Sequence, residues 1–280
     1  MHNSGMSKRA EEGFLSEQSI IKAIKANLFD YYAYLGRSPQ AELGETPELK
    51  WLNTGVTDSF LNHVLRTQLL PSSNVDVKIG EILEYFHSKG ITEFSWWVEP
   101  NSQPPDLNSH LLSHGLEYTD DEPGMACKLS EMNEGLTIPA AFTIEWVRDA
   151  DSLRQWVQVA IRGYGLPEAC TDACFKLFAG LGFDLPLRSY VGFLNRLPVA
   201  CSQLFLGAGV AGIYWVATVP EARKQGLGTA MTLAGLRQAR DLGYTIGILH
   251  PSKMGYKVYE GIGFREYCRM NTFLASAISK

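Results

Sequence analysis

The sequence has few cysteines and no long run of apolar residues. Its five cysteines, Cys127, Cys170, Cys174, Cys201 and Cys268, are an odd number without paired short spacings, which argues against a disulfide framework and against a zinc site. No stretch reaches the roughly 18 apolar residues of a membrane span, and the N-terminus lacks the apolar core of a signal peptide. We therefore expect a cytoplasmic protein with no membrane partner and no metal.

The sequence also lacks a strongly basic region. Its 280 residues carry a net charge of −5, but residues 1–140 hold 10 Lys/Arg against 20 Asp/Glu, whereas residues 141–280 hold 15 against 10. Nucleic acid is therefore an unexpected partner, and an anionic ligand should be attracted to the C-terminal half. With 45% hydrophobic residues the chain can bury sizeable cores.

The length and composition predict two domains joined by a polar linker. Residues 1–13 are expected to be disordered, residues 14–132 to form the first domain, residues 133–141 the linker and residues 142–280 the second domain. Within the second domain we expect, in chain order, strand Thr143–Val147, helices Ala150–Tyr164 and Asp172–Leu181, strands Ser189–Leu194, Ala200–Leu206 and Gly212–Val219, then a long helix and two further strands.

A glycine-bearing loop between a strand and a helix is the most informative motif. The segment Gly212–Ala217 is β-branched, aromatic and uncharged, as in a buried strand, and apolar residues recur at helical spacing beyond the loop. Gly226 and Gly228 remove Cβ atoms where a diphosphate would approach the backbone, and the free N–H groups and the dipole of the helix N-terminus attract an anion. Arg223 and Lys224 add positive charge, so the loop is predicted to bind a pyrophosphate.

Two motifs together resemble a known superfamily. Arg223-x-x-Gly226-x-Gly228 resembles the phosphate-binding signature of the GNAT superfamily of acyl-CoA-dependent N-acyltransferases. A nucleotide P-loop would need Gly-Lys-Ser/Thr, and a dinucleotide fingerprint would need a third glycine. The stretch from Met254 to Phe264 resembles the last helix of the superfamily, in which a tyrosine is followed four and five residues later by Gly-Phe. The resemblance implies an α/β (α+β) fold with a mixed central sheet flanked by helices.

The resemblance also implies that acetyl-CoA is the co-substrate. Backbone groups of the strand end would bind the pantetheine arm, with an N–H there polarising the thioester carbonyl, and the loop Lys224–Thr229 would take the diphosphate. The expected cofactor-binding residues are Val216, Ala217, Thr218, Val219, Arg223, Lys224, Gln225, Gly226, Leu227, Gly228, Thr229, Ser252 and Tyr256.

Tyr259 is the candidate general acid for the departing thiolate. A phenol with an ordinary pKa of about 10 stays protonated at neutral pH and can protonate a thiolate whose own pKa is near 8.5. Packing of an aromatic residue on a helix face is the alternative explanation. Tyr256, three residues earlier on a similar face, ranks second for the acid role.

The general base is harder to assign. An alkylamine is almost wholly protonated at pH 7, yet the strand Ile213–Val219 has no Asp, Glu or His, so the strand-borne base common in the superfamily is absent. His250, at the end of the next strand, is the substitute candidate, and a loop or core histidine without a catalytic role is the alternative. Glu145, Glu168 and Asp184 are further candidates that the sequence does not rank.

The first half carries a weaker copy of the second half, since Leu83–Val98 parallels Leu236–Leu249. A chance match of two α/β segments is the alternative. The copy predicts a tandem-GNAT chain whose first domain is degenerate and catalytically silent, because the phosphate-loop glycines and the tyrosine are replaced. Ungapped alignment places Ser73, Val75 and Asp76 at Gly226, Gly228 and Thr229, and places Leu111 opposite Tyr259.

The leading hypothesis is an N-acetyltransferase that transfers the acetyl group of acetyl-CoA to a primary amine by direct attack in a ternary complex. The acceptor would be a small molecule or a peptide, bound between the domains or by loops of the second half, in a monomer or homodimer. A non-catalytic acyl-CoA sensor or interaction protein is the alternative, favoured by the missing strand carboxylate. Tandem copies also occur in aminoacyl-tRNA-dependent peptidyl transferases, which the acidic balance and the intact loop disfavour.

Overall fold

The computed structural model describes residues 16–57, 59–119, 122–135 and 137–276. The segment 1–13, expected to be disordered, lies outside these residues. The described helices and strands are, in chain order, α1 (Glu17–Leu35), β1 (Glu42–Glu45), β2 (Leu49–Asn53), η1 (Ser59–Leu61), β3 (His63–Thr67), α2 (Val75–Ser88), β4 (Phe94–Val98), α3 (Leu107–Ser113), β5 (Glu117–Tyr118), β6 (Glu122–Lys128), η2 (Leu129–Glu131), β7 (Phe142–Trp146), α4 (Ala150–Tyr164), η3 (Glu168–Cys170), α5 (Thr171–Ala179), β8 (Leu187–Leu194), β9 (Leu197–Gly207), β10 (Val210–Thr218), η4 (Pro220–Ala222), α6 (Leu227–Asp241), β11 (Ile246–Leu249), α7 (Tyr256–Ile262) and β12 (Arg265–Ala275).

The alternation of helices and strands expected in the second half is confirmed, and local signals explain where its elements begin and end. Helix α4 starts at a capping box, because the Asp149 carboxylate accepts the Ser152 N–H at 2.8 Å while the Ser152 hydroxyl accepts the Asp149 N–H at 3.2 Å. The helix ends at Gly165, whose φ of 72° is the left-handed conformation that glycine adopts without a steric cost.

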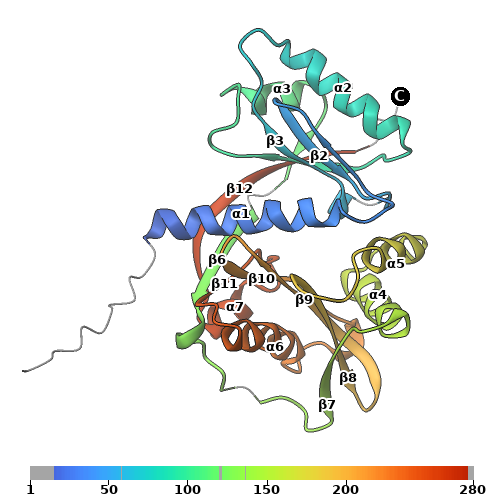
Figure 1. Ribbon diagram of the computed structural model, residues 1–280, viewed down its shortest axis with the longest axis vertical. Helices are drawn as coiled ribbons and strands as arrows, with labels where there is room; N and C mark the ends of the chain where they lie inside the picture. Colours follow the sequence, from blue (N-terminus) through green and yellow to red (C-terminus); the bar gives the residue numbers. More distant parts are fainter. Residues whose placement is uncertain (1–15, 58, 120–121, 136, 277–280) are drawn as a thin grey trace, which may run out of the picture.

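The described strands form one mixed sheet that runs through the molecule in the order β1-β2-β3-β4-β12-β6-β11-β10-β9-β8-β7, with β5 beside β12 (Figure 1). Parallel pairs join β3 to β4 and β10 to β11, and the remaining neighbours are antiparallel. Helix α6 packs on β9 and β10, as does α4. The Ser202 hydroxyl of β9 donates a hydrogen bond to the Met231 carbonyl of α6, and the Gln203 side chain accepts one from the Tyr31 hydroxyl of α1. Because successive side chains of a strand point to opposite faces, α6 and α1 cover opposite faces of the sheet.

The two halves exchange strands. β6 precedes the expected linker, yet it lies beside β11 in the sheet of the second half. β12 pairs with β6 over Arg265–Met270 and then continues to pair with β4 of the first half over Asn271–Ala275. This long strand passes from one lobe to the other in Figure 1. The domain boundary at residues 133–141 stays a prediction, and strands from both sides of this boundary lie in one sheet.

Helix α1 belongs to the first half of the sequence but packs on the second half. The side-chain amide of Asn27 donates to the Gly207 carbonyl at 2.8 Å, and its oxygen accepts the Tyr214 hydroxyl at 2.8 Å. The Tyr31 hydroxyl accepts the indole N–H of Trp215 at 2.8 Å, and the Tyr31 ring stacks on Tyr214 at 4.1 Å. All four side chains are buried or nearly so, so α1 fixes the middle of β10.

Two larger apolar cores follow from this arrangement. One core joins α1 to both faces of the second half and includes Trp156, Trp215 and Phe264. The other lies between the first-half strands and the helices α2 and α3, around Phe86 and Trp96. Within the described residues, no helix is long and apolar enough to cross a membrane.

Candidate active site at a splay between parallel strands

The cleft of the second half opens where β10 and β11 separate. The two strands pair in parallel from Ala211–Ile213 to Gly247–Leu249, and the pairing stops there. Beyond this point the register of β10 against β9 shifts between Tyr214 and Ala217, and Trp215 has a φ of 52°. A bulge of this kind re-aims the strand, and positive φ at a bulky residue stores strain of the sort found at functional sites.

The opening between β10 and β11 forms part of a cavity of about 820 Å³. Both diverging strands and α7 line it, and so do segments of the first half, including Tyr32 of α1, Phe60 of η1 and Glu122 of β6. The site is therefore built by both halves of the chain.

The glycine loop lies beside this opening. Gly226 is the N-cap of α6 with a φ of 76°, and no side chain caps the helix. The Ala230 N–H bonds back to the Gly226 carbonyl at 3.0 Å, which leaves the earlier N–H groups of the first turn for an external acceptor. A Cβ on Gly228 would stand 3.8 Å from Val216 Cγ1 and 3.9 Å from Thr218 Oγ1. The two segments expected to bind the cofactor thus meet.

Arg223 has a role that the sequence did not reveal. Its Nε donates to the Thr218 carbonyl at 3.1 Å, and its Nη2 donates to the Gly163 carbonyl at 2.8 Å. The guanidinium therefore ties the glycine loop to the ends of β10 and α4. The neighbouring Lys224 and Gln225 are exposed.

The other expected cofactor-binding residues fall into two groups. Ala217, Val219 and Leu227 are buried, so they can offer a ligand only backbone groups, as the sequence analysis expected. Ser252 and Tyr256 line the cavity. The Ser252 carbonyl accepts the N–H of Tyr256 at 3.1 Å, which starts α7.

Tyr259 extends from α7 into the cavity wall and is 9% exposed. Its ring contacts Phe264 edge-on at 6.0 Å, after the helix has ended at Gly263 with a φ of 115°. Burial raises the pKa of Tyr259 to about 12, with a hydrogen bond to the Thr232 side chain acting in the opposite direction. The phenol therefore carries its proton at neutral pH.

His250 also lies in the cavity wall. Neither ring nitrogen has a hydrogen-bonding partner of good geometry among the described residues, although both are buried. Burial lowers the pKa of His250 to about 4, and the nearby Pro123 backbone opposes this shift. The imidazole is neutral at pH 7, and its low basicity weakens it as a proton acceptor.

Glu145, Glu168 and Asp184 do not line this cavity, and all three are exposed elsewhere on the second half. The carboxylate in the wall is Glu122, which the sequence analysis missed. Burial raises the pKa of Glu122 to about 7. Glu122 belongs to the first half of the sequence, and it reaches the cleft because β6 pairs with β11 and β12.

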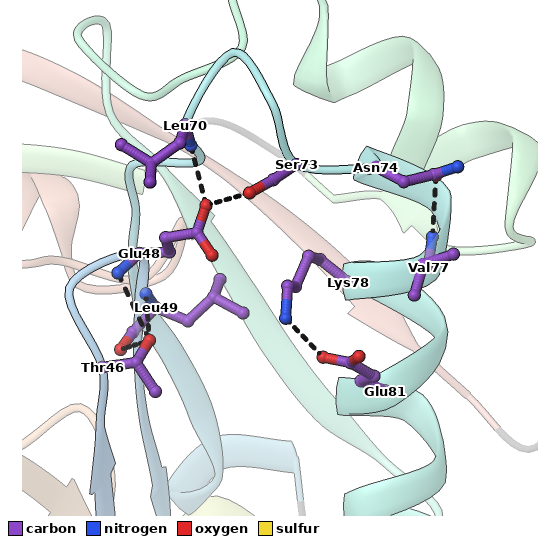
Figure 2. A network of polar contacts seen from close by, with 9 residues as sticks. All are labelled: Thr46, Glu48, Leu49, Leu70, Ser73, Asn74, Val77, Lys78 and Glu81. Carbon is purple, nitrogen blue, oxygen red and sulfur yellow. Dashed lines mark hydrogen bonds and ion pairs between the residues drawn. The ribbon is translucent and has the colours of Figure 1, made fainter.

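In the first half, side chains of the protein itself form hydrogen bonds at the loop that precedes α2 (Figure 2). The Glu48 carboxylate accepts the Leu70 N–H at 2.8 Å and the Ser73 hydroxyl. The Asn74 side chain caps α2 by accepting the Val77 N–H at 3.1 Å. Asn74 thus occupies an N–H group in the first turn of α2, whereas no side chain caps α6.

Two further residues of the first copy differ from the residues aligned with them in the second half. Asp76, in the first turn of α2, accepts hydrogen bonds from His110 at 2.9 Å and from His114 at 3.1 Å. Leu111, which the sequence aligned with Tyr259, is fully buried in the core beneath α3. An exposed carboxylate and a buried apolar side chain thus stand at the positions that the sequence aligns with Thr229 and Tyr259.

Comparison with known proteins gives a family match for the segment that contains both motifs. Residues 207–267 match the model of an acetyltransferase (GNAT) domain. A sequence search of curated proteins gave no significant match.

Solved structures resemble the chain over most of its length. A GCN5-related N-acetyltransferase from Kribbella flavida has a TM-score of 0.64 at 18% identity, with 90% of this chain and 95% of that chain covered. A functionally unknown conserved protein from Staphylococcus epidermidis has a TM-score of 0.62 at 13% identity, covering 84% and 93%. A tandem GNAT protein from the clavulanic acid biosynthesis pathway has a TM-score of 0.55 at 14% identity, covering 95% and 97%. Residues 207–267 thus match a GNAT domain model, and the fold of the chain resembles that of solved structures that include a GCN5-related N-acetyltransferase and a tandem GNAT protein.

Proposed function

We propose that the chain is an N-acetyltransferase that transfers the acetyl group of acetyl-CoA to a primary amine in a ternary complex. One observation carries the proposal. The uncapped N-terminus of α6 lies against the end of β10, and the buried phenol of Tyr259 lies in the wall of the cavity that opens from the same strand.

The residues present fit acetyl-CoA. The first turn of α6 offers backbone donors and the positive end of a helix dipole to the diphosphate. Past Ile213, none of the described strands pairs with β10 on its β11 side, so backbone groups of Val216 to Thr218 on that edge can bind the pantetheine arm. The thioester would then lie near the bulge at Trp215, at the mouth of the cavity.

Tyr259 is proposed to supply the proton that the leaving group requires. The neutral amine attacks the thioester carbonyl carbon, a C–N bond forms and the C–S bond breaks. The thiolate takes the Tyr259 proton, and the phenolate recovers a proton from the new amide nitrogen. Its pKa of about 12 keeps the phenol protonated before the reaction.

The domain roles and the cellular setting are part of the same proposal. The second half carries the acetyl-CoA site, the first half is catalytically silent, and the acceptor amine binds where the two meet. Five cysteines without disulfides among the described residues suit a reducing cytoplasm.

The test is an acetyl-CoA titration by calorimetry, run beside a CoA-release assay over a panel of primary amines and peptides. We expect binding and amine-dependent release. Binding without release by any acceptor would favour the alternative of an acyl-CoA sensor, to which the absence of a carboxylate on β10 points. Absence of binding would refute the glycine-loop assignment.

A further inference from the structure

Glu122 is the first residue of β6, opposite Met270 of β12. Side chains alternate along a strand, so Glu122 shares a face with Gly124, and a Cβ on Gly124 would touch Ile24 of α1. Glu122 therefore faces the α1 side of the sheet, where the cavity lies. It comes from the first half of the chain but faces the site of the second half.

Aromatic rings form much of the wall of the cavity that Glu122 lines. Phe60 of η1, Tyr164 of α4 and Trp215 of β10 contact one another, with ring centroids 5.4 Å (Phe60–Tyr164), 5.1 Å (Phe60–Trp215) and 5.4 Å (Tyr164–Trp215) apart. Tyr32 and Tyr214 line the same cavity. Such a wall favours an apolar or flat ligand, and the faces of the rings attract a cation.

Among the residues that the structure describes, the Glu122 carboxylate has no ion pair and no hydrogen bond, and desolvation accounts for the shift of its pKa. Arg269 shares the cavity, but its guanidinium is held by Glu266 at 2.7 and 2.9 Å. The other charged or titratable side chains of the cavity are His250, Lys253, Lys257 and the tyrosines 32, 118, 164, 214, 256 and 259.

Glu122 lines the wall of a cavity rich in aromatic rings, while part of its side chain stays accessible to solvent. Partial withdrawal of the carboxylate from bulk water raises the pKa of Glu122 to about 7. An ammonium group entering the cavity would supply the missing partner, and a base with a pKa near the working pH suits proton transfer.

We propose that Glu122 binds the ammonium group of the acceptor and takes its proton, and that the acceptor is a cationic amine with an apolar, ring-sized body that lies against Phe60, Tyr164 and Trp215. This inference rests on the proposed acetyltransferase function. It gives the first half a direct part in the site, even though that half lacks a phosphate loop.

The proton balance is complete with these two residues. The acceptor enters as an ammonium ion and passes one proton to the Glu122 carboxylate, which releases it to solvent after the reaction. The resulting neutral amine attacks the thioester, and its second proton ends on the sulfur of CoA through Tyr259. The products are the acetylated amine, CoA thiol and one proton in solution.

The experiment compares wild type, Glu122→Gln and Glu117→Gln with 2-phenylethylamine as the acceptor probe. Glu117 is an exposed carboxylate of β5 that does not line the cavity, so it is the matched control. We expect Glu122→Gln to lower kcat/KM for the amine about 100-fold, with the Kd for acetyl-CoA changed less than about twofold. Glu117→Gln should behave as wild type.

The pH profile separates a proton acceptor from a merely structural residue. In wild type, kcat/KM for the amine should rise with pH through about 7, the pKa of the Glu122 carboxyl, and should fall once the amine itself loses its proton. In Glu122→Gln the rise near pH 7 should disappear, and the rate should follow the free amine to higher pH.

The outcomes distinguish the inference from the function on which it rests. If wild type releases CoA with 2-phenylethylamine and Glu122→Gln matches Glu117→Gln, the role of Glu122 is wrong while the acetyltransferase stands. If wild type acetylates other amines of the panel but not this one, the proposed acceptor class is wrong. If no amine promotes CoA release, both proposals fail.

Discussion

At the scale of single residues, α7 shows how two tyrosines of one short helix acquire different chemistry. Tyr256 is half-exposed and donates its hydroxyl to Glu266 at 2.9 Å, and that bond raises its pKa. Tyr259 is buried beside Thr232 and faces the cavity. The hydroxyl of Tyr256 is already engaged with a carboxylate, whereas that of Tyr259 is placed to donate to a ligand.

Tyr259→Phe should therefore lower kcat on the order of 100-fold, because the leaving thiolate loses its proton donor. The Kd for acetyl-CoA should stay within about twofold of wild type. Steady-state kinetics and calorimetry measure the two quantities, and Tyr256→Phe is the matched control with a small expected effect. Because burial raises the pKa of Tyr259 to about 12, wild type should show no loss of activity from this group near pH 10. Equal rates for wild type and Tyr259→Phe would remove Tyr259 as the acid.

A second residue-scale prediction concerns the buried His63. Its Nδ1 accepts the Trp97 indole N–H at 3.1 Å, and its Nε2 lies 3.1 Å from the Phe60 carbonyl. Burial lowers the pKa of His63 to about 3, against a backbone hydrogen bond that raises it. His63 therefore stays neutral in the folded state at pH values below about 6.5, at which it is protonated in the unfolded chain. Because the unfolded state then binds more protons, the stability due to neutral His63 is lost as pH falls below that value.

Wild type should have a larger free energy of unfolding than His63→Gln at pH 7. This difference should decrease by about 1 kcal/mol between pH 7 and pH 5.5. Urea denaturation at the two pH values measures it. His87→Gln, at an exposed position of α2, is the control. A difference that does not change with pH would show that His63 binds protons equally in the folded and unfolded states.

At the scale of elements, α2 and α6 are helices that the sequence aligns with each other, but their N-termini are capped differently. α2 is closed by Asn74 and by the Glu48 carboxylate nearby, whereas α6 begins at an uncapped glycine. A helix that gives up a cap worth about 1 kcal/mol keeps its first donors for a ligand.

Gly228→Leu should abolish acetyl-CoA binding without unfolding the protein. The space around Gly228 admits a Cβ at ordinary contact distances, so the added side chain would project from the helix start into the space proposed for the diphosphate. Calorimetry measures the affinity, and circular dichroism checks the fold. Gly80→Ala in α2, where a Cβ meets nothing within 4 Å, is the control and should stabilise the protein by up to about 1 kcal/mol. Unchanged affinity in Gly228→Leu would place the cofactor elsewhere.

The sequence was informative wherever the signal was local. The strand, loop and helix around Gly226, and the tyrosine and Gly-Phe of α7, are patterns within a short stretch of chain. They predicted the fold, and the cofactor and acid roles assigned from them stay predictions. Glu122 and α1 escaped prediction because their positions depend on pairings between distant segments. Residues 122 and 270 meet through an exchanged strand, and no periodicity in either stretch reports its partner.

At the scale of the whole molecule, the halves of the sequence are not separable units of structure. Residues 142–280 alone would lack β6, which lies between β11 and β12, and α1, which braces β10. We expect this fragment neither to fold nor to bind acetyl-CoA, because the two strands would expose unpaired edges. Co-expression with residues 14–141 should restore binding, as measured by calorimetry on the purified complex. A monomeric fragment 142–280 with the affinity of the full chain would contradict the expectation.

The exchange of strands also bears on how the chain is made. Strand β4 emerges from the ribosome long before β12, its neighbour in the sheet, since residues 99–264 must be synthesised between them. Until then the nascent first half has an open edge, and β6 has no partner on its β12 side. Translation that stops short of residue 265 would therefore leave both lobes incomplete, and such products should be aggregation-prone and dependent on chaperones rather than merely shortened.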